Sequence, residues 1–203
     1  MAADKPDQPD SSGGAVAPAA SLLAEIERLK ADLAGAQRTI GELEARADVD
    51  PLLDILNRRG FERELRRSLA YLQRYQGEAV LLFVDLDGFK AVNDRHGHAA
   101  GDALLKAVAR ELTGHVRASD VVARLGGDEF GVLLWNLGSA QAVAKARELE
   151  RLIEAVSVAH GEARLVVGAS AGLAPLAVGA MPAEMIDAAD KAMYARKKER
   201  RER

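Results

Sequence analysis

Residues 79–87 read AVLLFVDLD, an apolar run that ends in two aspartates separated by a leucine. A short, continuous run of branched and aromatic side chains predicts a buried strand, here over residues 79–86. Because side chains alternate between the two faces of a sheet, Asp85 and Asp87 should project to the same side. Burying a carboxylate is costly unless it is paired or binds a metal ion, so these acids need a partner.

Two further acids, Asp128 and Glu129, directly follow Gly126-Gly127 at a predicted turn between two strands. Paired glycines permit positive φ angles and let the backbone approach a ligand closely. If this hairpin lies beside the first strand, Asp85 and Asp128 converge. The alternative interpretation is one exposed turn and one aspartate that caps a helix.

Converging carboxylates favour a metal site. Two carboxylates about 4 Å apart repel each other by roughly 4 kcal/mol at an effective dielectric constant of 20. A divalent cation between them would turn that repulsion into binding. The chain has no Cys and only four His, so oxygen ligands and substrate phosphates around Mg²⁺ or Mn²⁺ are the expected chemistry.

The remaining periodicity predicts an α/β domain of about 150 residues with a mixed rather than purely parallel sheet. One helix should begin at an Asn57 N-cap and end at Gly77. Further helices are predicted over residues 99–113, 139–157 and 182–198, and further strands over 121–125, 130–134 and 163–173.

The N-terminal part of the chain has a different character. Residues 1–18 are rich in Pro, Gly, Ser, Asp and Ala, which predicts a disordered tail or, alternatively, a short recognition peptide. Residues 19–47 predict a coiled-coil helix that forms a homodimer, with Ser21 as its N-cap. Its heptad seam consists of Ala19, Leu22, Ile26, Leu29, Leu33, Ala36, Ile40, Leu43 and Ala47. The alternative is one amphipathic helix packed on its own domain, and Asp50-Pro51 should end the helix in either case.

Composition excludes several classes of protein. The chain of 203 residues is 48% apolar, carries a net charge of −3 and has no Cys, which excludes disulfides, thiolate zinc sites and cysteine nucleophiles. Neither a strongly basic nucleic-acid binder nor a stacking platform is expected, since aromatic residues make up only 4%. No apolar stretch is long enough to cross a bilayer and no signal peptide is evident, so we expect a cytoplasmic protein without membrane insertion.

The stretch RLGGDEF, residues 124–130, resembles the signature of the GGDEF-domain diguanylate cyclases. The supporting motifs are Asp50-Pro51-Leu52, Asn57 to Phe61, Asp85 to Lys90, Asn93-Asp94, Gly97-His98, Gly101-Asp102, Ser170 to Gly172 and Ala189 to Tyr194. The resemblance covers about residues 48–201. It implies a palm-like α/β fold related to adenylyl cyclases and polymerases, and the condensation of two GTP into cyclic di-GMP with release of two pyrophosphates.

The resemblance also implies roles for individual residues. Asp85 and Asp128 would bind two Mg²⁺ ions, assisted by the Leu86 carbonyl. Asp128, with Glu129, would help to deprotonate the attacking 3′-hydroxyl. Phosphates would be contacted by Lys90, Arg124, Lys197 and Arg201. The guanine edge would be read by Asn93 and Asp102, and the substrate-binding set is completed by Phe89, His98, Gly126 and Gly127. The alternative for His98 is a helix cap.

Two further features follow from the same resemblance. Arg117 and Asp120 match the family's inhibitory product site, and their alternative interpretation is a surface salt bridge. Leu53-Asp54-Ile55 and Arg200-Arg201-Glu202 depart from the family pattern. The competing hypotheses are a domain that only binds GTP or cyclic di-GMP as a receptor, and a cyclase with relaxed base choice, for which Asp102 is the discriminating residue.

Overall fold

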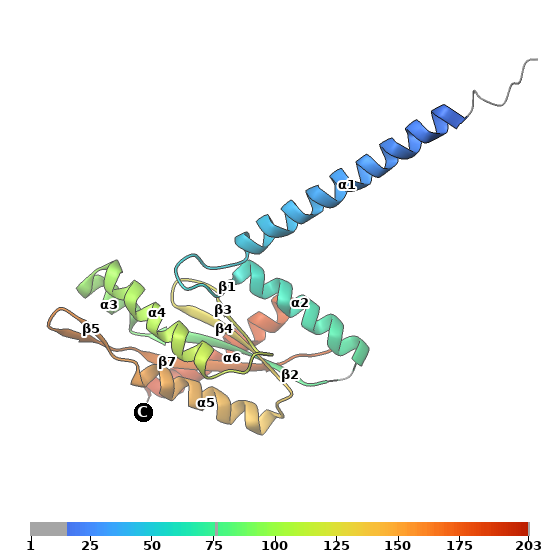
Figure 1. Ribbon diagram of the computed structural model, residues 1–203. Coiled ribbons are helices and arrows are strands. Elements are labelled where there is room, and N and C mark those ends of the chain that lie inside the picture. The colour runs from blue at the N-terminus through green and yellow to red at the C-terminus, as the bar shows by residue number, and fades with distance from the viewer. Residues whose placement is uncertain (1–15, 76, 203) are drawn as a thin grey trace, which may run out of the picture. The chain divides into compact units, whose positions relative to one another are not determined.

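The computed structural model describes residues 16–75 and 77–202, and it divides into two compact units at Arg46/Ala47 (Figure 1). The described part of the first unit belongs to α1, Val16–Ala47, a single helix of 32 residues whose last residue is the first of the second unit. The helix begins three residues before the predicted start, so Ser21 lies inside it, and the prediction that Ser21 is the N-cap is wrong. Residues 1–15 of the predicted tail lie outside the described residues.

The predicted seam of α1 is exposed where its side chains are described. Ile26, Leu29 and Leu33 are 46%, 54% and 59% exposed. Charged residues pair along the same helix, as in the Glu25–Arg28 and Glu27–Lys30 ion pairs at 2.7 and 2.8 Å. The side chains of Ala19, Ile40 and Leu43 lie outside the described residues. No helix in the described part of the chain is both long and apolar enough to span a bilayer.

The second unit is built on a five-stranded sheet with the strand order β1-β3-β4-β2-β7. Only β1 and β3 are parallel, and the other neighbours are antiparallel, so the prediction of a mixed sheet is confirmed. The elements are β1 (Leu56–Asn57), α2 (Arg58–Tyr75), β2 (Ala79–Asp87), α3 (Phe89–His96), α4 (His98–Gly114), β3 (Val121–Arg124), β4 (Glu129–Trp135), α5 (Ser139–Ala155), β5 (Val158–His160), β6 (Ala163–Leu165), β7 (Gly168–Pro175) and α6 (Pro182–Arg201).

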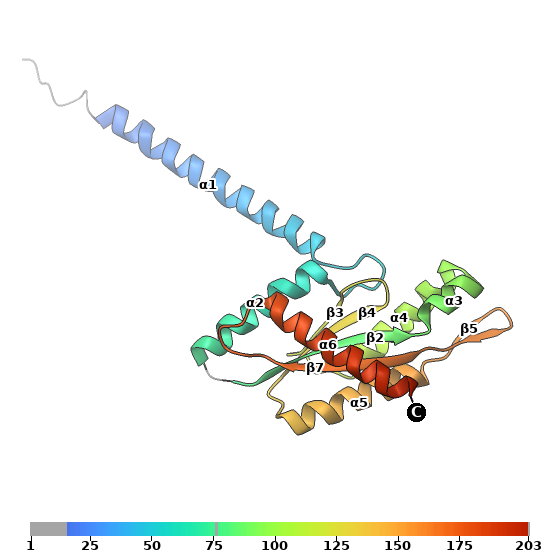
Figure 2. The same ribbon diagram turned by 180° about the vertical axis from the view of Figure 1, so that it is seen from behind.

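Helices cover both faces of this sheet, α4 and α5 on one side and α2 and α6 on the other (Figures 1 and 2). Side chains of β2 alternate between the two faces of the sheet, so successive residues pack against different pairs of helices. Val80, Leu82 and Val84 pack with α4 and α5, whereas Leu81 and Phe83 pack with α2 and α6. Residues 85 and 87 therefore continue the row that faces α2 and α6.

Three predictions about the elements need correction. The single strand predicted over residues 163–173 is two strands, and β6 pairs with β5 in a separate hairpin that turns at Gly161, where φ is +60°. The two-residue strand β1 was not predicted, because it is too short to show periodicity. The helix α3 was also not predicted. It is bounded by Gly88 and Gly97, whose positive φ angles of 86° and 83° separate it from β2 and α4.

Candidate active site

The two acidic motifs converge at one end of the pair β2 and β4. Asp85 lies opposite Glu129 in the antiparallel register, and the Leu86 N–H donates a hydrogen bond of 3.1 Å to the Asp128 carbonyl. Asp85 and Asp87 both contact Lys197 of α6, so the prediction that they project to one side is confirmed. Four acids from two sequence motifs are thereby gathered within reach of α6.

The turn between β3 and β4 is held by its own backbone and by Arg124. The Leu125 N–H donates to the Glu129 carbonyl at 2.8 Å. The Arg124 guanidinium donates to the carbonyls of Gly126 and Gly127, the latter at 2.8 Å, and to Asp50 Oδ2 at 3.2 Å. Arg124 therefore fixes the glycine turn through three of its five N–H groups.

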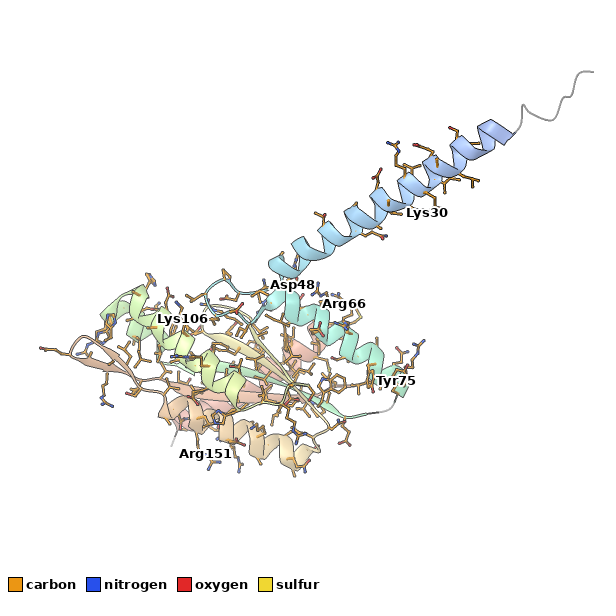
Figure 3. The ribbon with its side chains drawn as sticks, viewed as in Figure 1. Lys30, Asp48, Arg66, Tyr75, Lys106 and Arg151 are labelled. Carbon is orange, nitrogen blue, oxygen red and sulfur yellow. The ribbon has the colours of Figure 1, made fainter. Side chains whose placement is uncertain are left out.

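The N-terminal segment of the domain is tied down beside this turn. Asp48, labelled in Figure 3, is 2% exposed and binds Arg59 Nε at 2.7 Å and also Arg63. Two residues later, the Asp50 carboxylate accepts the backbone N–H groups of Leu52 and Leu53 and reaches Arg124 through its other oxygen. The first residues of the domain, 48–50, are therefore connected directly to the glycine turn.

The two acids of this turn, Asp128 and Glu129, have raised pKa values. Burial raises the pKa of Asp128, and the negative charge of Asp85 raises it further. Burial also raises the pKa of Glu129, against the opposing charge of Arg58 at 3.6 Å and with support from Asp190 and Asp85. Each of these carboxylates binds a proton more readily than usual, first because it is partly buried and second because other carboxylates lie nearby.

The donor set suits a hard divalent cation. The Asp85 and Asp128 carboxylates and the Leu86 carbonyl supply only oxygen atoms, which Mg²⁺ prefers. Within the described residues no three or more His, Cys, Asp or Glu side chains form a group that could hold a metal ion by themselves, so further ligands would come from water or substrate. A cation here would also relieve the repulsion between Asp85 and Asp128. These residues therefore fit the Mg²⁺ or Mn²⁺ ions that the sequence predicts.

Lys197 contributes a cation of the protein to the same place. Its ammonium contacts Asp85 Oδ1 and lies 3.2 Å from Asp87 Oδ1. Burial alone would lower the pKa of Lys197, but its hydrogen bonds to the two aspartates outweigh this effect and raise it. Asp87 Oδ2 in turn accepts a 2.7 Å hydrogen bond from Ser170 Oγ. Sequence reasoning assigned Lys197 to phosphate and gave Asp87 no role, while the side chain of Arg201 lies outside the described residues.

A second group of predicted residues lies on α3 and α4. Asn93 Oδ1 is buried and has no hydrogen-bond partner within the described residues. It packs so closely on Gly101 that a Cβ there would lie 1.9 Å from it. His98, Asp102 and Lys90 are exposed. An orphaned carbonyl oxygen of this kind is what a ligand that donates N–H groups would satisfy.

Not every predicted substrate residue is free to meet a ligand. The Phe89 side chain is 7% exposed and packs in the core between the sheet and α4. Gly126 lies against the Glu129 side chain, and a Cβ there would lie 2.5 Å from Glu129 Oε2, so a larger residue would displace this carboxylate. Gly127 is exposed, with nothing within 4 Å of the position its Cβ would take, which leaves the tip of the turn open to a ligand.

The predicted inhibitory pair lies before β3. Asp120 accepts hydrogen bonds from the backbone N–H groups of Arg117 and Trp135, at 2.9 and 3.0 Å. The pair is thus joined through the backbone of a tight turn, and the surface salt bridge that was the alternative is not what the structure shows. The Arg117 side chain is exposed beside a cavity of about 340 Å³ that Lys145 and Glu148 also line.

Comparison with known proteins places the chain in a family. Residues 47–203 match the family model described as diguanylate cyclase, GGDEF domain. The chain belongs to the GGDEF family. It is 42% identical over 172 residues to the probable diguanylate cyclase DgcE of Escherichia coli strain K12, and 38% identical over 183 residues to the diguanylate cyclase TpbB of Pseudomonas aeruginosa.

The chain spans only part of the length of these relatives. The alignments cover 82% and 89% of this chain but only 15% of DgcE and 41% of TpbB. Among solved structures, the coiled coil and GGDEF domain of DgcB from Caulobacter crescentus, in complex with c-di-GMP, matches with a TM-score of 0.73. That match covers 88% of this chain and 95% of the solved DgcB chain at 24% identity, and it shows a shared fold.

Proposed function

We propose that the protein is a diguanylate cyclase that condenses two GTP into cyclic di-GMP and releases two pyrophosphates. The observation that carries the proposal is the convergence of Asp85 and Asp128 at the ends of β2 and the glycine turn. The names of relatives such as DgcE and TpbB support the same reaction. GTP is therefore the proposed substrate and cyclic di-GMP the proposed product.

The reaction joins the 3′-hydroxyl of one GTP to the α-phosphate of the other. Two Mg²⁺ or Mn²⁺ ions, held by Asp85, Asp128 and the Leu86 carbonyl, would supply charge neutralisation and a lowered pKa for the hydroxyl. Asp128 and Glu129 accept the hydroxyl proton, a role that suits carboxyl groups whose pKa is raised. Lys197 and the exposed Lys90 neutralise the phosphates.

Guanine selection is assigned to Asn93 and Asp102. The orphaned Asn93 Oδ1 accepts one N–H group, and the exposed Asp102 carboxylate accepts others from the guanine edge. Adenine does not offer the same pair of donors on that edge. A cyclase with relaxed base choice is therefore the less favoured hypothesis.

The reaction needs two domains, because each site holds one GTP. The exposed side chains of Ile26, Leu29 and Leu33 on α1 support a homodimeric coiled coil that raises the effective concentration of the domains. Replacing Leu29 and Leu33 with Glu should give specific activity that falls steeply on dilution and a monomeric mass by light scattering. A variant that stays dimeric and equally active at nanomolar concentration would exclude α1 as the dimerisation device.

Product inhibition is assigned to Arg117 and Asp120. The exposed Arg117 guanidinium can bind an anionic product, and the Asp120 carboxylate orders the turn that presents it. Arg117→Ala should keep the initial rate and lose the inhibition by added cyclic di-GMP. Unchanged inhibition in this variant would place the inhibitory site elsewhere.

The second candidate is a receptor that binds GTP or cyclic di-GMP without turnover, since Arg124 and Lys197 are both engaged with protein groups. One experiment separates the two functions. The protein is incubated with Mg²⁺ and GTP, with ATP in a parallel reaction, and the products are identified by mass spectrometry. Cyclic di-GMP from GTP supports the cyclase, whereas binding of GTP without product supports the receptor.

A further inference from the structure

The last turns of α6 place an ammonium group at the acidic centre of the site. Lys197 Nζ contacts Asp85 Oδ1 and lies 3.2 Å from Asp87 Oδ1. The side chains of Lys197, Asp85 and Asp87 keep only 20%, 17% and 27% of their exposure. The charges therefore meet where water screens them little, and the cation that balances Asp85 in the structure belongs to the protein itself.

The two aspartates differ in how firmly they are held. Asp87 Oδ2 accepts a hydrogen bond of 2.7 Å from Ser170 Oγ, and Ser170 is completely buried on β7. Gly168, the register partner of Asp87, packs on its Cβ. Asp87 is thus fixed by the edge of the sheet, while Asp85 is the acid that would bind a divalent cation.

We propose that Lys197 is the resident counter-ion of Asp85, that a divalent cation must displace its ammonium to reach this carboxylate, and that Asp87, fixed by Ser170, retains the displaced ammonium beside the site. The inference rests on the proposed function only in assigning Asp85 to the cation. Asp87 and Ser170 act here as positioning residues for Lys197.

Displacement has a thermodynamic consequence. The favourable contact between Lys197 and Asp85 must be broken before the cation gains Asp85, so it weakens cation binding in the absence of nucleotide. A phosphate that accepts the released ammonium offsets this cost. Cation and nucleotide therefore strengthen each other's binding by the same factor, which protects the site from filling with cations when no substrate is present.

The first test is the affinity for Mn²⁺ of the full-length, nucleotide-free protein, measured by electron paramagnetic resonance of the free ion. Lys197→Met removes the ammonium and keeps an unbranched side chain. Lys198→Met is the matched control, because Lys198 is the next residue of α6, is exposed and carries the same charge. Lys197→Met should tighten Mn²⁺ binding on the order of tenfold, the scale of a close and partly shielded charge contact, and Lys198→Met should leave it within about twofold.

Two results would overturn the displacement. Equal Mn²⁺ affinity in wild type and Lys197→Met would mean that the ammonium does not compete. Equal tightening in Lys197→Met and Lys198→Met would mean that the general charge of α6 acts, rather than a contact with Asp85.

A second measurement follows Lys197 in the unaltered protein. Acylation of lysine amines is quantified by mass spectrometry with and without saturating Mn²⁺, and Lys198 serves as the internal reference. Mn²⁺ should speed the acylation of Lys197 several-fold and leave Lys198 unchanged, and Asp87→Asn should speed it further at saturation. An unchanged rate with Mn²⁺ would overturn displacement, and an Asp87→Asn rate equal to wild type would overturn retention by Asp87.

Both measurements omit nucleotide, so their failure is separate from failure of the proposed function. A protein that makes cyclic di-GMP while Lys197→Met binds Mn²⁺ no more tightly than wild type would keep the function and lose this inference. A protein that shows both Mn²⁺ effects and makes no cyclic dinucleotide would keep this inference and lose the function.

Discussion

Two groups of shielded carboxylates lie on either side of the edge strand β7, and they are balanced in opposite ways. Glu150 of α5 is 4% exposed, accepts the Ala171 N–H at 3.0 Å and binds Arg196 at 3.2 Å, with Arg200 at 3.7 Å. Asp128 instead lies beside Asp85, and its pKa is raised. A carboxylate surrounded by donors of its own protein stabilises the fold, whereas one crowded by other acids provides a place for a cation from outside.

The Glu150 group also reaches the active site through α6. Arg200 donates to the Ala169 carbonyl at 2.7 Å and contacts Glu154, so α5, β7 and α6 are joined at one end. A cavity of about 460 Å³ beside these contacts is also lined by Arg151, which Figure 3 labels on α5. Lys197 directly follows Arg196 in α6, so this group helps to hold Lys197 at the acids.

The largest expected effect is a loss of activity, and it follows from a change in the Asp128 group. Asp128→Asn removes the charge of one proposed cation ligand and proton acceptor, and it should lower cyclic di-GMP synthesis by about 10³-fold or more. Folding should survive, because a turn side chain contributes little packing. The measurement is the initial rate with Mg²⁺ and GTP, together with circular dichroism. Asp94→Asn, an exposed acid on α3, is the control and should keep the wild-type rate.

The second prediction concerns stability. Glu150→Ala leaves Arg196 and the Ala171 N–H without their buried partner, and it should lower the free energy of unfolding by about 3–5 kcal/mol. Glu148→Ala removes an acid from the same helix whose side chain is 45% exposed and pairs with Lys145, and it should cost at most about 1 kcal/mol. Urea unfolding checks both. Equal losses in the two variants would show that the Glu150 group is not what stabilises this end of the fold.

The contrast between the Glu150 group and the Asp128 group also explains which site residues could be predicted from the sequence and which could not. The acids at residues 85, 87, 128 and 129 stand next to an apolar strand or paired glycines, and these local signals predicted their convergence. Glu150 has no such signal, because its partners come from β7 and α6, far along the chain. The buried face of α5 consists of Ala142, Ala146, Leu149 and Ile153 together with Glu150, so an acid stands in an otherwise apolar row.

Two other differences between the predictions and the structure also arise from contacts between distant parts of the chain. The resemblance predicted Asn93 and Asp102, but only the structure shows that Gly101 makes room for the Asn93 carbonyl oxygen. Arg124 and Lys197 were assigned to phosphate from their positions in motifs. In the structure Arg124 contacts Asp50, and Lys197 contacts Asp85 and Asp87. These contacts depend on packing between segments that lie far apart in the sequence.

The third prediction tests an acid that belongs to neither group. Asp102 is exposed on α4, so its proposed role depends on guanine rather than on protein partners. Asp102→Ala should lose a charge-assisted hydrogen bond and lower kcat/KM for GTP by roughly 10- to 150-fold, with little change in stability. Competition between GTP and ATP measures the base preference. A preference for GTP equal to wild type would show that guanine is read by other residues.

The smallest effect tests the crowding of acids directly. The pKa of Asp128 is raised in the folded protein by burial and by Asp85, so the folded state holds a proton there more tightly than the unfolded chain does. Its contribution to stability is therefore fully present below the unfolded value of 3.8 and is lost as the pH rises through the higher folded pKa. Asp128→Asn resembles the protonated acid at every pH. In a metal-free buffer, wild type should lose thermal stability relative to this variant between pH 4 and pH 7, by about 2 °C in Tm. A difference in Tm that stays constant over this range would mean that burial and Asp85 do not raise the pKa of Asp128, and the contrast with Glu150 would fail.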